Sequence, residues 1–150
     1  LNVTEANLKV GETVQLTATV APDNASQEVL WVSDAEGIAS VDSATGLVTA
    51  NSAGTAIITA TSTMNPEKKA QCTVVVTRDD TTLDVAIKAA EEKIREENFE
   101  NKYTEASKTA LRENLENAKL AKENANLSVE DVKLVVDALN ASIEELQLKQ

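Results

Sequence analysis

Residues 45–62 read TGLVTANSAGTAIITATS, and this stretch decides the fold of the first half of the chain. It sets apolar pairs beside small hydroxyl residues, and Gly46 and Gly54 interrupt the pattern. Short runs of β-branched and apolar residues between glycines are typical of strands joined by tight turns. The stretch therefore predicts two strands, at 46–50 and 55–62, and its residues read as scaffold.

The residues on either side of this stretch continue the strand pattern. Residues 14–20 read VQLTATV, in which apolar and polar residues alternate as they do in a half-buried strand. Further short runs of extended character lie at 29–33, 38–42 and 71–77. Several short strands with no helical period among them predict an antiparallel β-sandwich.

In the C-terminal half, apolar residues recur at helical spacing instead. The first predicted helix begins with the capping signal Thr81-x-x-Asp84. The second begins after Thr104, and the third begins at Ser128, with Asp131 three residues on. The apolar stripes are Leu83, Ile87, Ala90 and Ile94; Leu111, Leu115, Ala118 and Ala121; and Val132, Val135, Leu139, Ser142 or Ile143, and Leu146. Three amphipathic helices with short polar connections predict a three-helix bundle.

Composition excludes several classes of function. The net charge of −11 is shared by both halves, and such a surface repels phosphate backbones and anionic headgroups, so we expect no nucleic-acid or membrane partner. The chain has no histidine and one cysteine, which removes an imidazole base, an imidazole metal ligand and any Cys-His pair. Catalysis would have to rest on carboxylates.

The single cysteine and the ends of the chain bear on its origin. One cysteine cannot form an internal disulfide, which fits either a cytosolic protein or an exported bacterial one. No apolar run approaches about 18 residues and no charged-then-apolar leader opens the chain, so we expect neither a membrane span nor a signal peptide. Because Leu1 is not an initiator methionine, we expect a piece of a longer protein.

The first half resembles a known family. The order GETVQLTATV at 11–20, VLWVSD at 29–34, ASVDSATGLVTANSAGTAIITATS at 39–62 and CTVVV at 72–76 resembles the bacterial immunoglobulin-like domain of group two. The resemblance covers residues 1–78 and implies an immunoglobulin-like β-sandwich.

The second half resembles the three-helix FIVAR module. The matching residues are Tyr103-Thr104-x-x-Ser107, Leu111, Leu115, Ala118, Leu127-Ser128-x-x-Asp131-Val132 and Ala141-x-Ile143-x-x-Leu146. The sequence departs from the family at Lys108, where that family usually has a tryptophan. Together the resemblances imply two domains, an all-β immunoglobulin-like sandwich at 1–78 followed by an all-α three-helix bundle at 81–150.

Both families are repeated accessory modules of large secreted or wall-attached proteins of Gram-positive bacteria, often beside glycoside hydrolase domains. The resemblance therefore implies a non-catalytic spacer that is extracellular or in the cell wall. Its partners would be neighbouring modules of the same polypeptide, and we expect a monomer without cofactors. The alternative is an adhesion or docking module that contacts a host protein, a wall glycan or a sibling module.

The few aromatic residues and the cysteine favour packing roles. Trp31 lies in a predicted strand, where a core position is the favoured reading and a sugar-stacking platform is the alternative. We expect Phe99 and Tyr103 to pack across a helix connection. Three aromatics in the whole chain cannot form an aromatic strip that grips a polysaccharide. Cys72 alternates with valines in a strand and is predicted to be a buried thiol.

The acidic residues give no catalytic, cofactor-binding or metal site. The loop residues Asp23, Asp34, Asp42, Asp79 and Asp80 could supply oxygen ligands to calcium, but they lack the alternating spacing of a dedicated calcium loop. The pairs Glu91-Glu92, Glu96-Glu97 and Glu144-Glu145 occupy adjacent helix positions, which diverge by about 100°, so they do not face one another. We expect a solvated surface at both sets.

The predicted junction between the domains is short. Only residues 78–80 separate the last strand from the first helix, whereas a flexible tether would be longer and rich in glycine and serine. We therefore expect the domains end to end, as a rod of about 70 Å.

Overall fold

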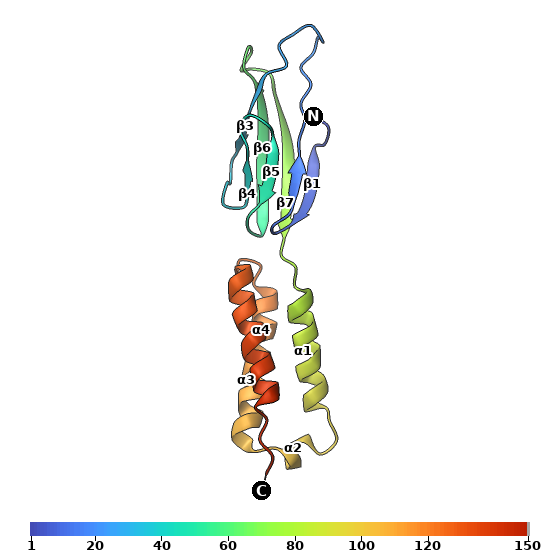
Figure 1. The fold of residues 1–150 in the computed structure, drawn as a ribbon, viewed down its shortest axis with the longest axis vertical. Coiled ribbons are helices and arrows are strands. Elements are labelled where there is room, and N and C mark those ends of the chain that lie inside the picture. Colours follow the sequence, from blue (N-terminus) through green and yellow to red (C-terminus); the bar gives the residue numbers. More distant parts are fainter. Residues whose placement is uncertain (150) are drawn as a thin grey trace. The chain divides into compact units, whose positions relative to one another are not determined.

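The computed structural model describes residues 1–149. The chain divides into two compact units, of which the first is Leu1–Arg78 and the second begins at Asp79 (Figure 1). The first unit consists of β-strands and the second of helices. Each unit has its own hydrophobic core.

The first unit is a sandwich of two sheets. Its strands are β1 (Glu5–Lys9), β2 (Thr13–Gln15), β3 (Val29–Ser33), β4 (Ala39–Val41), β5 (Leu47–Ala50), β6 (Gly54–Ser62) and β7 (Lys69–Thr77). One sheet has the strand order β1-β7-β6-β3, and the other has the order β2-β5-β4. All pairs are antiparallel except β1 and β7, which run parallel.

The core of the sandwich lies between the sheets and follows from the period of two. Along β6 and β7 every second side chain turns inward, so Ile58 and Val74 are fully buried while Thr55 and Thr73 face solvent. Trp31 fills the centre at 2% exposure. The predicted strands at 46–50 and 55–62 are confirmed as β5 and β6 to within one residue.

One predicted strand is shorter than expected, and one strand was missed. The alternation at 14–20 predicts seven strand residues, and its apolar members do turn inward. Pairing stops near Gln15, because its partner β5 begins at Leu47 and Leu16 already donates to the Gly46 carbonyl at 3.0 Å. Strand β1 was not predicted, since its sequence EANLK has few β-branched or aromatic residues.

Gly46 meets two demands in the turn between β4 and β5. Its φ of +75° lies in the left-handed region that favours glycine, and its N–H donates to the Asp42 carbonyl at 2.9 Å. A Cβ at this position would lie 2.6 Å from Cε2 of Trp31. The glycine therefore allows both the turn and the close approach of the indole ring.

Over its described residues, 79–149, the second unit contains four helices around one core. They are α1 (Thr81–Ile94), α2 (Phe99–Lys102), α3 (Glu105–Glu123) and α4 (Val129–Glu144). The buried residues of this core are Leu83, Ala86, Ala90, Phe99, Tyr103, Leu111, Leu115, Ala118, Val132, Val136 and Leu139. Three long helices were predicted, and the four-residue α2 is an addition that a helical period cannot reveal at this length.

Two details of the helices differ from the sequence-based prediction. Helix α1 begins at Thr81 with Asp84 in its first turn, as predicted, but the N-cap is Asp80 and no side-chain capping bond forms; the Thr81 N–H instead donates to Asp79 Oδ1 at 3.1 Å. On α4, Val136 takes the buried position predicted for Val135, which is half-buried. The capping box of Ser128 and Asp131 is confirmed.

Candidate functional site

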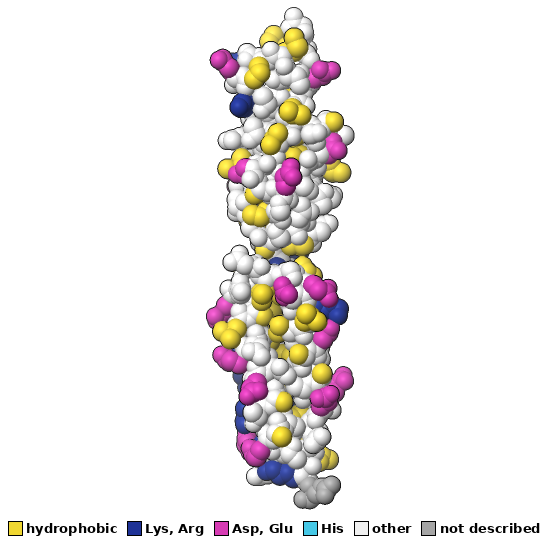
Figure 2. Space-filling model, turned by 90° about the vertical axis from the view of Figure 1, so that its left-hand side faces the viewer, with side chains coloured by type: hydrophobic (Ala, Val, Ile, Leu, Met, Phe, Trp, Pro, Cys, Tyr) yellow, Lys and Arg dark blue, Asp and Glu magenta, His cyan; other side chains and the backbone are white. Residues whose placement is uncertain are grey.

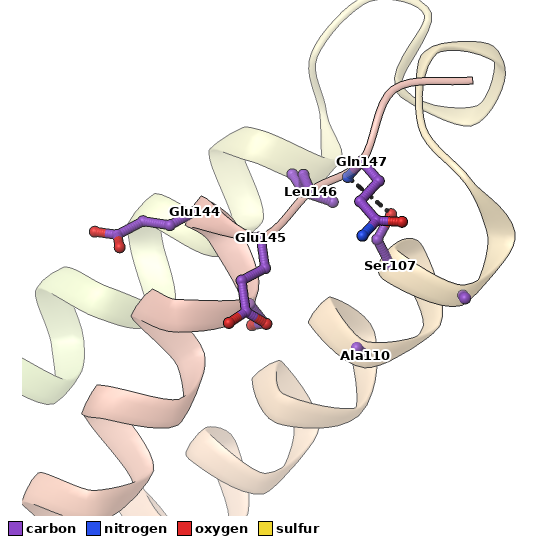
Figure 3. A pocket seen from close by; sticks show the side chains of 8 residues that line it. Ser107, Ala110, Glu144, Glu145, Leu146 and Gln147 are labelled. Carbon is purple, nitrogen blue, oxygen red and sulfur yellow. Dashed lines mark hydrogen bonds between the residues drawn. The ribbon is translucent and has the colours of Figure 1, made fainter. Parts of the chain in front are cut away.

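An open pocket of about 590 Å³ lies in the helical unit, between the start of α3 and the end of α4 (Figure 3). The residues that line it are Ala106, Ser107, Ala110, Ser142, Glu144, Glu145, Leu146 and Gln147. The pocket is a candidate catalytic site, because hydroxyl groups and carboxylates both line it.

The two hydroxyl groups of the pocket are engaged with the backbone. Ser107 Oγ donates to the Thr104 carbonyl at 3.1 Å and accepts from the Gln147 N–H at 3.3 Å. Ser142 is buried, and its Oγ donates to the Leu139 carbonyl at 2.7 Å. A nucleophilic serine needs its proton to be taken by an adjacent base. Both hydroxyls instead stabilise local backbone structure.

The two carboxylates of the pocket point in different directions. Figure 3 shows the Glu144 side chain directed away from that of Glu145. Glycoside hydrolysis by a carboxylate pair requires two groups that flank one bond, so the diverging arrangement does not provide this geometry. The structure thus agrees with the divergence expected from adjacent helix positions.

A buried cation, which the sequence analysis did not predict, lies at the corner between α2 and α3. The Lys108 side chain is 2% exposed, and its Nζ donates to the Glu100 carbonyl at 2.9 Å, to Glu100 Oε2 at 3.0 Å and to Glu105 Oε1 at 2.6 Å. Arg112 also pairs with Glu100. One signal could have found it: Lys108 stands three residues before Leu111, on the apolar stripe of α3.

These contacts shift the pKa of each partner. The hydrogen bond from Lys108 lowers the pKa of the Glu100 and Glu105 carboxyls, and the bond to Glu105 raises the pKa of the Lys108 ammonium. All three groups therefore stay charged over a wide pH range. The arrangement holds the charges in place and leaves no poised acid or base.

The C-terminal segment closes this end of the unit. The Thr104 N–H donates to the Gln147 carbonyl at 2.8 Å, and the Lys149 N–H donates to the Lys102 carbonyl at 3.0 Å. Tyr103 and Leu148 form an isolated antiparallel bridge between these bonds. The corner that Lys108 occupies is therefore part of the fold's own packing.

The aromatic residues and Cys72 pack inside the units. The rings of Phe99 and Tyr103 lie 5.4 Å apart, and both side chains are buried at the helix connection, as predicted. Trp31 is in the sandwich core, so the structure favours the packing role over a sugar platform. Cys72 is fully buried, and burial raises the pKa of its thiol.

Two of the loop acids, Asp42 and Asp34, accept hydrogen bonds from backbone groups. Asp42 Oδ1 accepts from the Thr45 N–H at 2.7 Å and from the Ala44 N–H at 3.1 Å, and the Thr45 bond lowers the pKa of this carboxyl. Asp34 Oδ1 accepts from the Ile57 N–H at 2.7 Å. Within residues 1–149, no group of three or more His, Cys, Asp or Glu side chains is placed to hold a metal ion.

Several acids on the helices pair with surface cations. Glu91 lies 2.9 Å from Lys119 Nζ, and Glu96 lies 2.7 Å from Lys93 Nζ.

Across the part of the chain that the structure describes, no helix is both long and apolar enough to cross a membrane.

The fold and these contacts define the first unit as an immunoglobulin-like sandwich whose notable side chains serve packing and turns. Residues 1–74 match the family model described as bacterial Ig-like domain (group 2), so the first unit is a bacterial immunoglobulin-like domain. This finding confirms the resemblance inferred from the first half of the sequence. The resemblance of residues 81–150 to the FIVAR module stays a prediction.

The related proteins are much longer than this chain. A segment of the lacto-N-biosidase of Bifidobacterium bifidum is 49% identical over 73 residues, which is 49% of this chain and 6% of that protein. A segment of the 3-O-alpha-D-galactosyl-alpha-L-arabinofuranosidase of Bifidobacterium longum subsp. longum is 43% identical over 76 residues, 50% of this chain and 7% of that protein. The chain thus matches only a small share of the length of each of these proteins.

Among solved structures, the N-terminal domain of the group B Streptococcus alpha C protein is similar at a TM-score of 0.44 and 17% identity. The similarity covers 81% of this chain and 68% of that one.

Proposed function

We propose that this chain is a non-catalytic accessory segment that acts as a spacer in a larger, secreted or wall-attached bacterial protein, of the kind that acts on carbohydrates. One observation carries the proposal. The same immunoglobulin-like domain recurs as a 6% and a 7% share of two glycosidases. A domain that occupies so little of an enzyme supplies position or spacing more readily than the reaction itself.

The side-chain chemistry of the helical unit supports this role. The pocket hydroxyls bond to the backbone, the adjacent carboxylates diverge, and Lys108 is engaged by two glutamates. In the helical unit, the three long helices α1, α3 and α4 would form the three-helix module, with α2 as part of a connection. Both units would then serve as modules in series, with neighbouring modules of the same polypeptide as partners.

An activity assay tests the non-catalytic part of the proposal. The purified chain is incubated with chromogenic glycosides and soluble polysaccharides, and we expect no turnover above buffer. Turnover that survives purification to homogeneity and disappears when a single carboxylate is replaced, for example by Glu145→Gln, would overturn the proposal. The matched control is Glu92→Gln on α1, outside the pocket.

Small-angle scattering tests the spacer part. The short junction at 78–80 predicts a radius of gyration above about 20 Å, whereas one compact globule of this length would give about 15 Å. A value near the compact figure would contradict the spacer.

A docking role is the second candidate, and one observation favours it. On the outer face of β3 and β6, Leu30 is 50% exposed, Val32 is 52% exposed and Ile57 is 36% exposed. On the face shown in Figure 2, hydrophobic side chains of the sandwich stand in small groups among polar atoms, which is more typical of a spacer than of a large docking patch. Binding to wall glycan or to a host protein that Val32→Thr abolishes without lowering the melting temperature would favour docking.

A further inference from the structure

The path of the chain through the sandwich places its first and last strands side by side. Strand β1 pairs with β7 over five residues in parallel register, from Glu5 opposite Thr73 to Lys9 opposite Thr77 (Figure 1). The chain therefore enters this pair at the Glu5 end and leaves it at the Thr77 end. Tension applied where the chain enters and leaves the unit acts on opposite ends of one ladder.

Hydrogen bonds between the two chain segments continue just beyond both ends of this ladder. The Thr73 N–H donates to the Thr4 carbonyl at 2.9 Å, and the Val10 N–H donates to the Thr77 carbonyl at 3.0 Å. The Lys9 N–H turns the other way and donates to Glu12 Oε2 at 2.8 Å. Because successive N–H groups of a strand alternate in direction, those of even-numbered β1 residues face β7.

Further contacts hold the entry of the chain against the segment that follows β2 and against the core. The Asn2 N–H donates to the Thr17 carbonyl at 2.9 Å, and Asn2 Oδ1 accepts from the Thr17 N–H at 2.9 Å. The side chains of Ala6 and Leu8 pack against the core between the sheets. Strand β1 is thus held by its ladder, its side chains and the segment that precedes it.

The direction of the load decides how such a ladder fails. When two parallel strands are pulled along their axes in opposite senses, all the bonds between them carry the load together. When the strands are pulled apart from one end, the bonds break one after another. Forced unfolding is a kinetic event, so bonds that must break together slow it.

We propose that the parallel β1–β7 pair is a mechanical clamp that lets the sandwich transmit tension without unfolding. This inference rests on the proposed spacer function, because only a segment in series with other modules carries tension. In addition to setting the distance between neighbouring modules, the sandwich would then bear the tension between them.

Single-molecule force spectroscopy on the full chain tests the clamp by comparing two directions of pulling. The first attachment is an N-terminal tag in both cases. The second is an exposed thiol introduced by Thr82→Cys, which loads the ladder along its axis, or by Lys69→Cys, which peels the pair from the Glu5 end. Cys72 does not compete for attachment, since it is fully buried.

We expect the unfolding force of the sandwich to be at least about twice as high through Thr82→Cys as through Lys69→Cys, because bonds across five residue pairs then break together. Equal forces in the two directions, or a higher force in the peeling direction, would overturn the clamp.

Two proline variants locate the clamp in the ladder. Ala6→Pro removes an N–H that faces β7, whereas Asn7→Pro removes the next N–H along, which faces away from β7. When each variant is pulled through Thr82→Cys, we expect the unfolding force of Ala6→Pro to fall by about half. The unfolding force of Asn7→Pro should stay close to that of the chain without the proline. The same force for both variants would overturn the assignment.

If Ala6→Pro does not fold, the comparison of pulling directions on the otherwise unchanged chain still decides the question. The measurement is independent of the spacer proposal, which fails by turnover or by a compact radius of gyration, whereas the clamp fails by an equal unfolding force in both directions.

Discussion

The two units bury polar groups in different ways. In the sandwich, the buried polar side chains are neutral: Ser33 Oγ donates to the Ala39 carbonyl at 2.6 Å, and Ser62 lies at the end of β6. In the helical unit, the buried polar groups include the cation of Lys108, held by Glu100 and Glu105. A neutral pair is insensitive to pH, whereas an ion pair depends on the charge of both partners.

The surfaces of the two units differ in the same way, because charged contacts shift more carboxyl pKa values in the helical unit than in the sandwich. Carboxyls of the helical unit whose pKa values are lowered by neighbouring groups include Glu91, Glu96, Glu100, Glu105 and Asp131. In the sandwich, Asp42 has a lowered pKa, through the Thr45 N–H. The sandwich therefore depends chiefly on packing and backbone ladders, and the helical unit adds electrostatics to packing.

The largest expected effect is that of Trp31→Ala. Removing an indole that is 2% exposed should cost about 3–5 kcal/mol, a large part of the stability of a small domain. Amide NMR should show the resonances of the sandwich collapse while those of the helices persist. Val32→Ala, at an exposed position of the same strand, is the control and should change little. Sandwich resonances that survive Trp31→Ala would contradict the core role of the ring.

The corresponding core truncation in the helical unit is Leu111→Ala in α3. This side chain is fully buried, so its truncation should cost about 2–5 kcal/mol and unfold the helices selectively. Helical circular dichroism should fall while the fluorescence of the single tryptophan keeps its folded spectrum. Leu120→Ala, 56% exposed on the same helix, should leave both signals unchanged. Loss of the tryptophan signal would show that the units unfold together.

Acid should separate the units without a mutation, with an effect below that of either core truncation. A carboxyl whose pKa is lowered in the folded state adds stability above its unfolded pKa, about 4.3 for glutamate, and that stability disappears as the pH falls through the folded value. We therefore expect the melting temperature of the helices to fall below about pH 4 more steeply than that of the sandwich. Parallel changes in both units between pH 6 and pH 2 would refute this contrast.

The smallest expected effect is that of the α4 cap. Ser128 Oγ accepts from the Asp131 N–H at 3.1 Å, so Ser128→Ala should cost about 1 kcal/mol in the helical unit alone. Chemical denaturation followed at the helical band measures it. Ser128→Asp keeps a capping acceptor and should restore most of the loss. An equal loss with both substitutions would mean that the cap contributes through another contact.

Sequence reasoning succeeded where one local pattern fixes one structure. The run at 45–62 predicted β5 and β6 because alternation and glycines specify both strands and their turn. It failed where the cause lies elsewhere in the chain. Strand β1 forms because β7 offers a free edge, and β2 is short because β5 begins at Leu47.

The candidate site shows the same limit. The burial of Trp31 and the divergence of Glu144 and Glu145 follow from strand and helix periods, and the sequence predicted both. The burial of Lys108 depends on Glu100, which α2 brings to the start of α3. A period of 3.6 residues shows that Lys108 is on the apolar stripe, but not which acid meets it there.

The pairing of the first strand with the last also sets the order of events when the chain is made. Strand β1 leaves the ribosome early, but its partner β7 follows only after the whole sandwich sequence has been synthesised. Until then the sheet lacks its closing strand. Topologies rich in such distant contacts fold in milliseconds to seconds, whereas helical bundles fold in microseconds to milliseconds. The helical unit, although it is made second, should therefore reach its native state soon after release, while completion of the sandwich is the slower step.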